Sequence, residues 1–157
     1  MVVISLNSPK ISWHMLEEID DNDFEYTQYK TYDEEGSYIP GETINKTLRV
    51  WNNYAGKEDV LGAQNCKLII SFKNFEDNFL LNLITIQINE GEIYSLDIDM
   101  NRGIIDIGNL SGIANNGSNL NWANYKDLNI AIGPLPNNIK SELKSMYFYL
   151  EYTEEEL

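Results

Sequence analysis

Apolar and polar residues alternate with a period of two along most of this 157-residue chain, and this alternation is the feature that most limits its fold. Apolar residues at every second position place one row of side chains on a single face of a β-strand. The pattern is clear in six segments, at 44–50, 66–72, 84–88, 94–98, 128–132 and 146–152. Half-buried strands of this kind need a second sheet to cover their apolar faces, so the sequence predicts an all-β, antiparallel β-sandwich.

Turn-forming residues separate these segments, which supports short strands joined by hairpins. Clusters rich in Asn, Gly and Pro lie at 52–56, 89–91, 101–103, 115–117 and 133–137. A helix is expected only in small pieces, the best candidate being one or two turns at 137–144, after the proline pair.

The net charge of −14 is unevenly distributed along the chain. Residues 1–42 carry −8 and residues 151–157 carry −4, so the part between them is nearly neutral. The densest acidic stretch, 17–25, is expected to be an exposed loop because like charges repel. We therefore predict an acidic N-terminal lead and arm at 1–42, a β-sandwich domain at 43–152 and an acidic tail at 153–157.

The sign of the charge also limits the partners of the protein. Nucleic acid and anionic membranes would repel a chain with a pI near 4.3, so neither is expected as a partner. The sequence contains no run of 18 apolar residues, and its first residues do not resemble a signal peptide, so we expect a protein that is intracellular when made. A single cysteine excludes an internal disulfide.

The residue types that carry chemistry are scarce. His14 is the only histidine, so a complete metal site or catalytic triad around it is not expected, and we interpret it as a structural or surface residue. Cys66 lies on an apolar strand face and is interpreted as a small buried hydrophobe. The acids at 97–103 suggest a calcium loop, but Arg102 replaces its glycine, so a hairpin turn is favoured. We predict no catalytic, metal or cofactor site and no enzymatic activity.

Aromatic residues give the remaining candidates for binding. Tyr26, Tyr29, Tyr32 and Tyr38 follow one another among acids in the N-terminal part and are candidates for a partner interface; alternatively, their rings cover the edge of the sandwich. Exposed rings can also stack on sugars, and for this second possibility the candidates are Trp51 and Trp122.

Two parts of the chain resemble immunoglobulin-like domains of bacteria and viruses. The first is GETINKTLRVWNN at 41–53, followed by QNCKLII at 64–70, and the second is IAIGP at 130–134, followed by the segment at 146–152. The whole chain is similar to small virion proteins of bacteriophages or phage tail-like particles. This resemblance implies an immunoglobulin-like fold, a place in a tail, baseplate, neck or capsid decoration, and no catalytic residue.

Three functions follow from these observations, in order of preference. The first is a non-enzymatic structural component of a bacteriophage or phage-derived tail-like particle, present in the host cytoplasm during assembly and bound to other virion proteins or to copies of itself. The second is a carbohydrate-binding module that recognises a cell-surface glycan. The third is a glycan-cleaving enzyme, because its two carboxylates need not be close in sequence.

Overall fold

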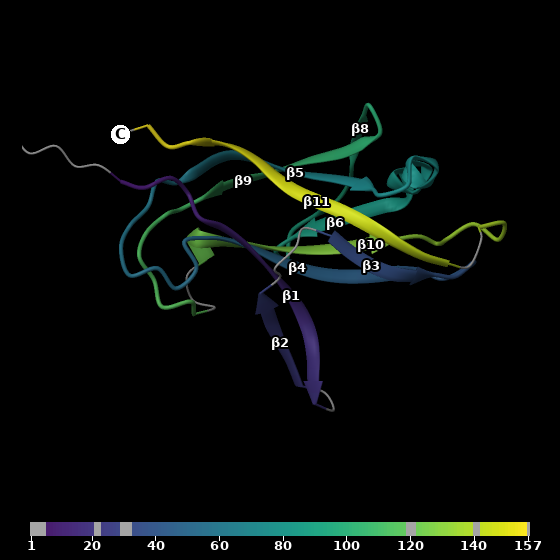
Figure 1. Ribbon diagram of the computed structural model, residues 1–157, viewed down its shortest axis with the longest axis horizontal. Coiled ribbons are helices and arrows are strands. Elements are labelled where there is room, and N and C mark those ends of the chain that lie inside the picture. Colours follow the sequence, from purple (N-terminus) through teal and green to yellow (C-terminus); the bar gives the residue numbers. More distant parts are fainter. Residues whose placement is uncertain (1–5, 21–22, 29–32, 119–121, 140–141, 157) are drawn as a thin grey trace, which may run out of the picture.

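A computed structural model describes residues 6–20, 23–28, 33–118, 122–139 and 142–156. Within these residues the chain forms eleven β-strands in two antiparallel sheets, together with two short 3-10 helices (Figure 1). The predicted fold class is thus confirmed: the protein is all-β, and its two antiparallel sheets form a sandwich.

The first sheet has six strands in the order β2-β1-β4-β10-β6-β7. In chain order these strands are β1 (Ile11–Asp20), β2 (Asp23–Gln28), β4 (Ile44–Asn52), β6 (Ile84–Ile88), β7 (Ile93–Ser95) and β10 (Tyr125–Ile132). We call it the six-stranded sheet.

The second sheet has five strands in the order β3-β11-β5-β9-β8. They are β3 (Asp33–Tyr38), β5 (Ala63–Phe72), β8 (Asp97–Asp99), β9 (Arg102–Leu110) and β11 (Glu142–Glu154). The two 3-10 helices are η1 (Phe75–Leu83), between β5 and β6, and η2 (Trp122–Asn124), before β10.

The apolar rows that the alternation predicts meet between the sheets. On β5 the row Cys66, Leu68, Ile70 and Phe72 is buried, and so is the row Leu128, Ile130 and Ile132 on β10. Rings from the two sheets also touch across the interior, where Trp13 of β1 packs edge-on against Phe148 of β11 with ring centroids 4.8 Å apart. Removal of this apolar surface from water is the main stabilisation of such a fold.

The predicted boundary between an N-terminal lead and a sandwich at 43 is wrong. Strand β1 pairs with β4 from Ile11 to Met15, which buries Trp13 to 2% exposure. Strand β3 pairs with β11 and brings Tyr38 into the core at 3% exposure. The predicted tail at 153–157 is also partly in the sheet, because β11 continues to Glu154. The predicted boundaries followed the distribution of charge, whereas the strand pairing depends on buried apolar residues such as Trp13 and Tyr38.

The acidic stretch at 17–25 is a β-hairpin and not the predicted loop. Beyond Met15, β1 no longer pairs with β4, and Leu16–Asp20 pair only with β2. Figure 1 shows this two-stranded part extending away from the sheets at the bottom of the view. We call residues 16–20 and 23–26 the acidic ribbon.

Two further local predictions differ from the structure. The segment at 94–98 is not one strand, because the chain passes from the six-stranded sheet to the five-stranded sheet at the buried Leu96. No helix follows the prolines in the described part of 137–144. The longer 3-10 helix is η1, which is linked to β11 by a buried ion pair between Asp77 and Lys144, with Oδ1 and Nζ 2.7 Å apart.

In the part of the chain that is described, no helix has the length and apolar composition needed to cross a membrane.

The burial of Trp13 leads to a stability prediction for the N-terminal strand. A Trp13→Ala variant should lose about 3–5 kcal/mol of unfolding free energy, because it leaves a cavity between the two sheets. The measurement is urea-induced unfolding followed by fluorescence or circular dichroism. The matched control is Phe75→Ala, which changes an aromatic side chain that is 72% exposed and should cost about 0.5 kcal/mol or less. Equal stability of the two variants would contradict the placement of β1 in the core.

Candidate functional site

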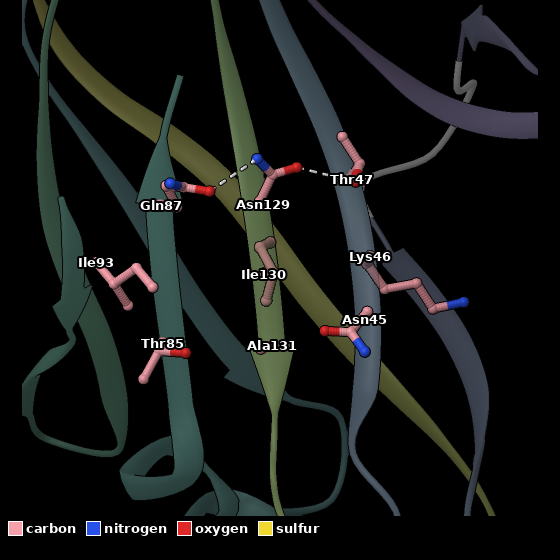
Figure 2. A pocket seen from close by; sticks show the side chains of 9 residues that line it. All are labelled: Asn45, Lys46, Thr47, Thr85, Gln87, Ile93, Asn129, Ile130 and Ala131. Carbon is pink, nitrogen blue, oxygen red and sulfur yellow. Dashed lines mark hydrogen bonds between the residues drawn. The ribbon is translucent and has the colours of Figure 1, made fainter. Parts of the chain in front are cut away.

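A polar hollow of about 340 Å³ lies on the outer face of the six-stranded sheet (Figure 2). It spans β4, β10, β6 and β7, the four strands farthest from the acidic ribbon. Its lining residues are Asn45, Lys46, Thr47, Thr85, Gln87, Ile93, Asn129, Ile130 and Ala131. The volume is within the range of about 300–1,000 Å³ that is typical of small-molecule sites.

The strand register brings the polar positions of three strands into rows across this face. Asn129 on β10 lies between Thr47 on β4 and Gln87 on β6. The neighbouring row in the same direction holds Asn45 and Thr85. Each of these residues comes from the polar side of the alternation, so the period of two that builds the core also builds this surface.

Hydrogen bonds run along the first row from Thr47 through Asn129 to Gln87. The Thr47 hydroxyl donates to Asn129 Oδ1 at 3.0 Å, and Asn129 Nδ2 donates to Gln87 Oε1 at 3.4 Å (Figure 2). Gln87 Nε2 then donates to the carbonyl of Gly91 at 2.9 Å. We call Thr47, Asn129 and Gln87 the amide row. Because each side chain is held by its neighbours, the orientation of both amides is fixed.

The remaining lining of the hollow is nearly neutral. Lys46 is its one charged side chain, and Figure 2 shows Lys46 and Ile93 at opposite ends of the hollow, both on the side of the amide row where Asn45 and Thr85 lie. Ile93 is 67% exposed and supplies an apolar contact surface. Among the described residues that line the hollow there is no carboxylate, histidine or cysteine, so its side chains can bind a polar ligand but offer neither a metal ligand set nor a nucleophile with a base.

Next to the amide row, the same sheet face carries a buried ion pair. Arg49 of β4 binds Asp127 of β10 with two hydrogen bonds, Nε to Oδ1 at 2.6 Å and Nη2 to Oδ2 at 3.0 Å. The Arg49 guanidinium also lies 4.2 Å from the centre of the Tyr125 ring. Both geometries are typical of strong arginine contacts, and they fix β4 against β10.

His14 belongs to this buried group. Its ring is 2% exposed, contacts the Tyr54 ring at a centroid distance of 4.4 Å, and has Nε2 3.1 Å from the Ser12 hydroxyl oxygen. Burial, assisted by the nearby Arg49 charge, lowers the pKa of His14 to about 4, so the ring is neutral near pH 7. A serine next to a neutral histidine resembles part of a nucleophile and base pair, but neither residue lines the hollow. The interpretation of His14 as a structural residue agrees with this position.

The tryptophan candidates for sugar stacking do not form the predicted platform. Trp51 is 1% exposed and packs between Tyr125 and Tyr54, with centroid distances of 4.6 and 5.1 Å. Its ring therefore presents no face to a ligand, and its proposed role is wrong for this structure. Trp122 lies in η2, but its side chain is outside the described residues. Alternation could not reveal the burial of Trp51, because Trp51 lies on the strand face that is usually solvated.

The tyrosine candidates are also separated. Tyr38 is buried against Phe72, so it belongs to the core and not to an interface. Tyr26 lies on β2 opposite Leu16, in the acidic ribbon, and Tyr29 and Tyr32 lie outside the described residues. Tyr147 and Tyr149, on the outer face of the five-stranded sheet, are among the exposed aromatic residues and were not candidates.

The other candidate groups have structural roles. Cys66 is fully buried, and burial raises the pKa of its thiol to about 11, which agrees with its interpretation as a small hydrophobe. Asp97 and Asp99 lie on β8, and the residues after them form the two-residue turn to β9. Met100 and Asn101 both have positive φ there, as the predicted hairpin requires. No cluster of three or more metal-binding side chains occurs within the described ranges.

An exposed apolar side lies where the two sheets meet at β7 and β8. Ile93, Tyr94, Ile98 and Met100 are 67%, 46%, 44% and 85% exposed. Both strands are sheet edges, so they also present backbone groups without a strand partner on one side. We call residues 93–100 the apolar edge. Alternation does not predict this apolar edge, because it places Tyr94 and Ile98 in the core.

Comparisons with known proteins identify no family. No protein-family model matches the chain, and no curated protein matches it. One solved structure is similar to it, that of AvmM, which catalyses macrocyclization in alchivemycin A biosynthesis. The two chains are 12% identical, the alignment covers 81% of this chain and 89% of AvmM, and the TM-score is 0.37.

The prediction that the chain is not an enzyme is contradicted by this comparison, because the similar protein is a catalyst, and we do not retain it. A TM-score of 0.37 at 12% identity assigns no residue, substrate or reaction to this chain.

The buried position of His14 leads to a prediction about pH. The unfolded chain binds a proton at His14 near pH 6.5, whereas the folded protein does so only near pH 4. The free energy of unfolding should therefore decrease as the pH falls through this interval, because protons favour the unfolded state. A His14→Gln variant lacks this contribution and should show a weaker dependence over the same interval. Urea unfolding at a series of pH values measures both proteins, and identical pH profiles would contradict the burial of a neutral imidazole.

Proposed function

We propose that the protein is a structural subunit of a phage or phage-derived tail-like particle, which assembles by binding neighbouring subunits through the acidic ribbon and the sheet edges. The acidic ribbon is the observation that carries this proposal. The resemblance of the sequence to small virion proteins supplies the class of particle.

The acidic ribbon has little support from strand pairing. Among the described residues its strands pair only with each other, and a lone two-stranded hairpin is only marginally stable in water. Glu17 lies directly opposite Glu25, where like charges on adjacent strands are unfavourable. The stretch at 16–26 contains six acids and no base. A ribbon of this composition is best explained by a basic surface on a neighbouring subunit, which would neutralise the charge and order the hairpin.

Acidic residues also gather on the edges of both sheets. The four edge strands β2, β3, β7 and β8 contain seven acids and no base. The lysines and arginines found in strands lie on inner ones, among them β4 and β5. Charged edges oppose pairing between identical edges, so this distribution disfavours open-ended association of copies and favours a different, basic partner.

The apolar edge supplies a second contact area. An exposed group of four large apolar side chains is a common mark of a protein interface. Its neighbours Asp97 and Asp99 add negative charge beside the apolar surface. A partner with apolar residues inside a basic rim would match both features, and this description fits the same basic neighbour.

The acidic ribbon can be removed by a precise shortening of the hairpin. Leu16 pairs directly with Tyr26, so replacing 17–25 by Asn-Gly closes the hairpin at an existing pair. We expect the unfolding free energy to change by about 1 kcal/mol or less, because the described strand residues that are removed pair only with each other. Affinity purification with the full-length chain should recover tail, baseplate or capsid subunits, and the shortened chain should recover less than about a tenth as much.

The control keeps the ribbon and changes only its charge. Substitution of Glu17, Glu18 and Glu25 by Gln should weaken recovery of the partner and should remove most of its dependence on salt. If the full-length chain recovers no particle subunit, or if the shortened chain recovers as much as the full-length chain, the proposed function is wrong.

A further inference from the structure

The amide row has unused hydrogen-bonding groups that face the hollow. A primary amide has two N–H donors and an oxygen with two lone pairs. Asn129 uses one donor and one lone pair within the row, and Gln87 uses one lone pair within the row and one donor to the Gly91 carbonyl. Each therefore keeps one donor and one acceptor. The Thr47 hydroxyl donates a hydrogen bond to Asn129 Oδ1, and its oxygen can still accept one from a ligand.

These groups are oriented before any ligand binds. The three side chains come from the adjacent strands β4, β10 and β6, and the hydrogen bonds between them restrict their rotation. Binding of a ligand would cause little further loss of side-chain conformational entropy, which is the main advantage of a preorganised site. An ordinary solvated strand face carries long charged side chains, whereas this one carries short amides and hydroxyls.

The electrostatics of the hollow restrict the class of ligand. Only Lys46 is charged among the lining residues, and the net charge of −14 opposes anionic ligands such as phosphates. A cation would find no carboxylate there. An apolar ligand would cover the amides without satisfying them, which is unfavourable. A neutral ligand with many hydroxyl groups satisfies all of these conditions, because each hydroxyl both donates and accepts.

We infer that the hollow binds a neutral saccharide, whose hydroxyls pair with Asn129, Gln87 and Thr47 while its C–H groups contact Ile93 and Ala131. Asn45 and Thr85 lie in the next row and extend the polar surface beyond one sugar ring. This site differs from the predicted one, which relied on tryptophan stacking. It lies away from the acidic ribbon, which carries the proposed assembly function, and shares only Ile93 with the apolar edge.

The direct test is an NMR titration of the full-length protein with two neutral probes, maltotriose and N,N′,N″-triacetylchitotriose. Side-chain amide signals of Asn129, Gln87 and Asn45 should shift in a saturable manner with at least one probe. The absence of saturable shifts with both probes would overturn the inference. Saturable shifts centred on Tyr147 and Tyr149 of the other sheet would also overturn it, because the sugar would then bind elsewhere.

Variants separate binding from stability. Asn129→Ala and Gln87→Ala should each weaken the binding of the responding probe roughly tenfold, because each removes two ligand hydrogen bonds. The matched control is Asn82→Ala, which changes an exposed amide on η1 outside the hollow and should leave the dissociation constant unchanged. If a variant does not fold, Thr47→Val removes only the hydroxyl and should weaken binding in the same direction. Unchanged affinity in the folded variants would exclude the amide row as the site.

The outcomes distinguish this inference from the proposed function. Loss of saccharide binding in Asn129→Ala should leave recovery of particle subunits unchanged, whereas shortening of the acidic ribbon should leave saccharide binding unchanged. Each proposal can therefore fail while the other stands.

Discussion

The ion pair between Arg49 and Asp127 is the interaction on which the outer face of the six-stranded sheet depends. It joins the two central strands β4 and β10, and both residues are largely shielded from water. Loss of one partner would leave a buried charge without compensation, which is far more costly than the pair is stabilising. The backbone of Asp127 also accepts a hydrogen bond from the Asn89 N–H and donates one to the Asn89 side chain, so the same residue links β10 to the end of β6. Two residues further along these strands lies the amide row, whose alignment follows from the same register.

The same ion pair divides this sheet face into two regions with different chemistry. On one side, the Tyr125, Trp51 and Tyr54 rings and the neutral His14 form a small buried group outside the main core. On the other side, the amide row lies open to solvent. Arg49 can serve both regions because its guanidinium stacks on Tyr125 while its edge binds the carboxylate. The rigid aromatic side thus holds the strands that present the amides.

The alternation of apolar and polar residues predicted the sandwich and most of its inner strands, because every second side chain of such a strand faces the core. It could not predict the placement of β1 and β3, since their pairing partners, β4 and β11, are distant in sequence. It also misjudged Trp51, because period two does not show when a loop covers the outer face. The amide row consists of residues that alternation places on polar faces, but its identity required the register of β4, β10 and β6, which depends on tertiary contacts.

The charge distribution acquires a different meaning once the strands are placed. By sequence, the acids lie at the two ends of a neutral body; in the structure, most N-terminal acids lie on the acidic ribbon and on the edge strand β3, whereas Glu151 and Glu154 lie on the inner strand β11. Edges are where a sandwich can accept another strand, and the middle of a sheet is where a rigid face is available for a small ligand. A neighbouring subunit bound at the acidic ribbon would leave the hollow uncovered, since the hollow spans β4, β10, β6 and β7 and shares only Ile93 with the apolar edge. A subunit held at its acidic ribbon could therefore expose this face to solvent, where a saccharide on a target surface would meet it.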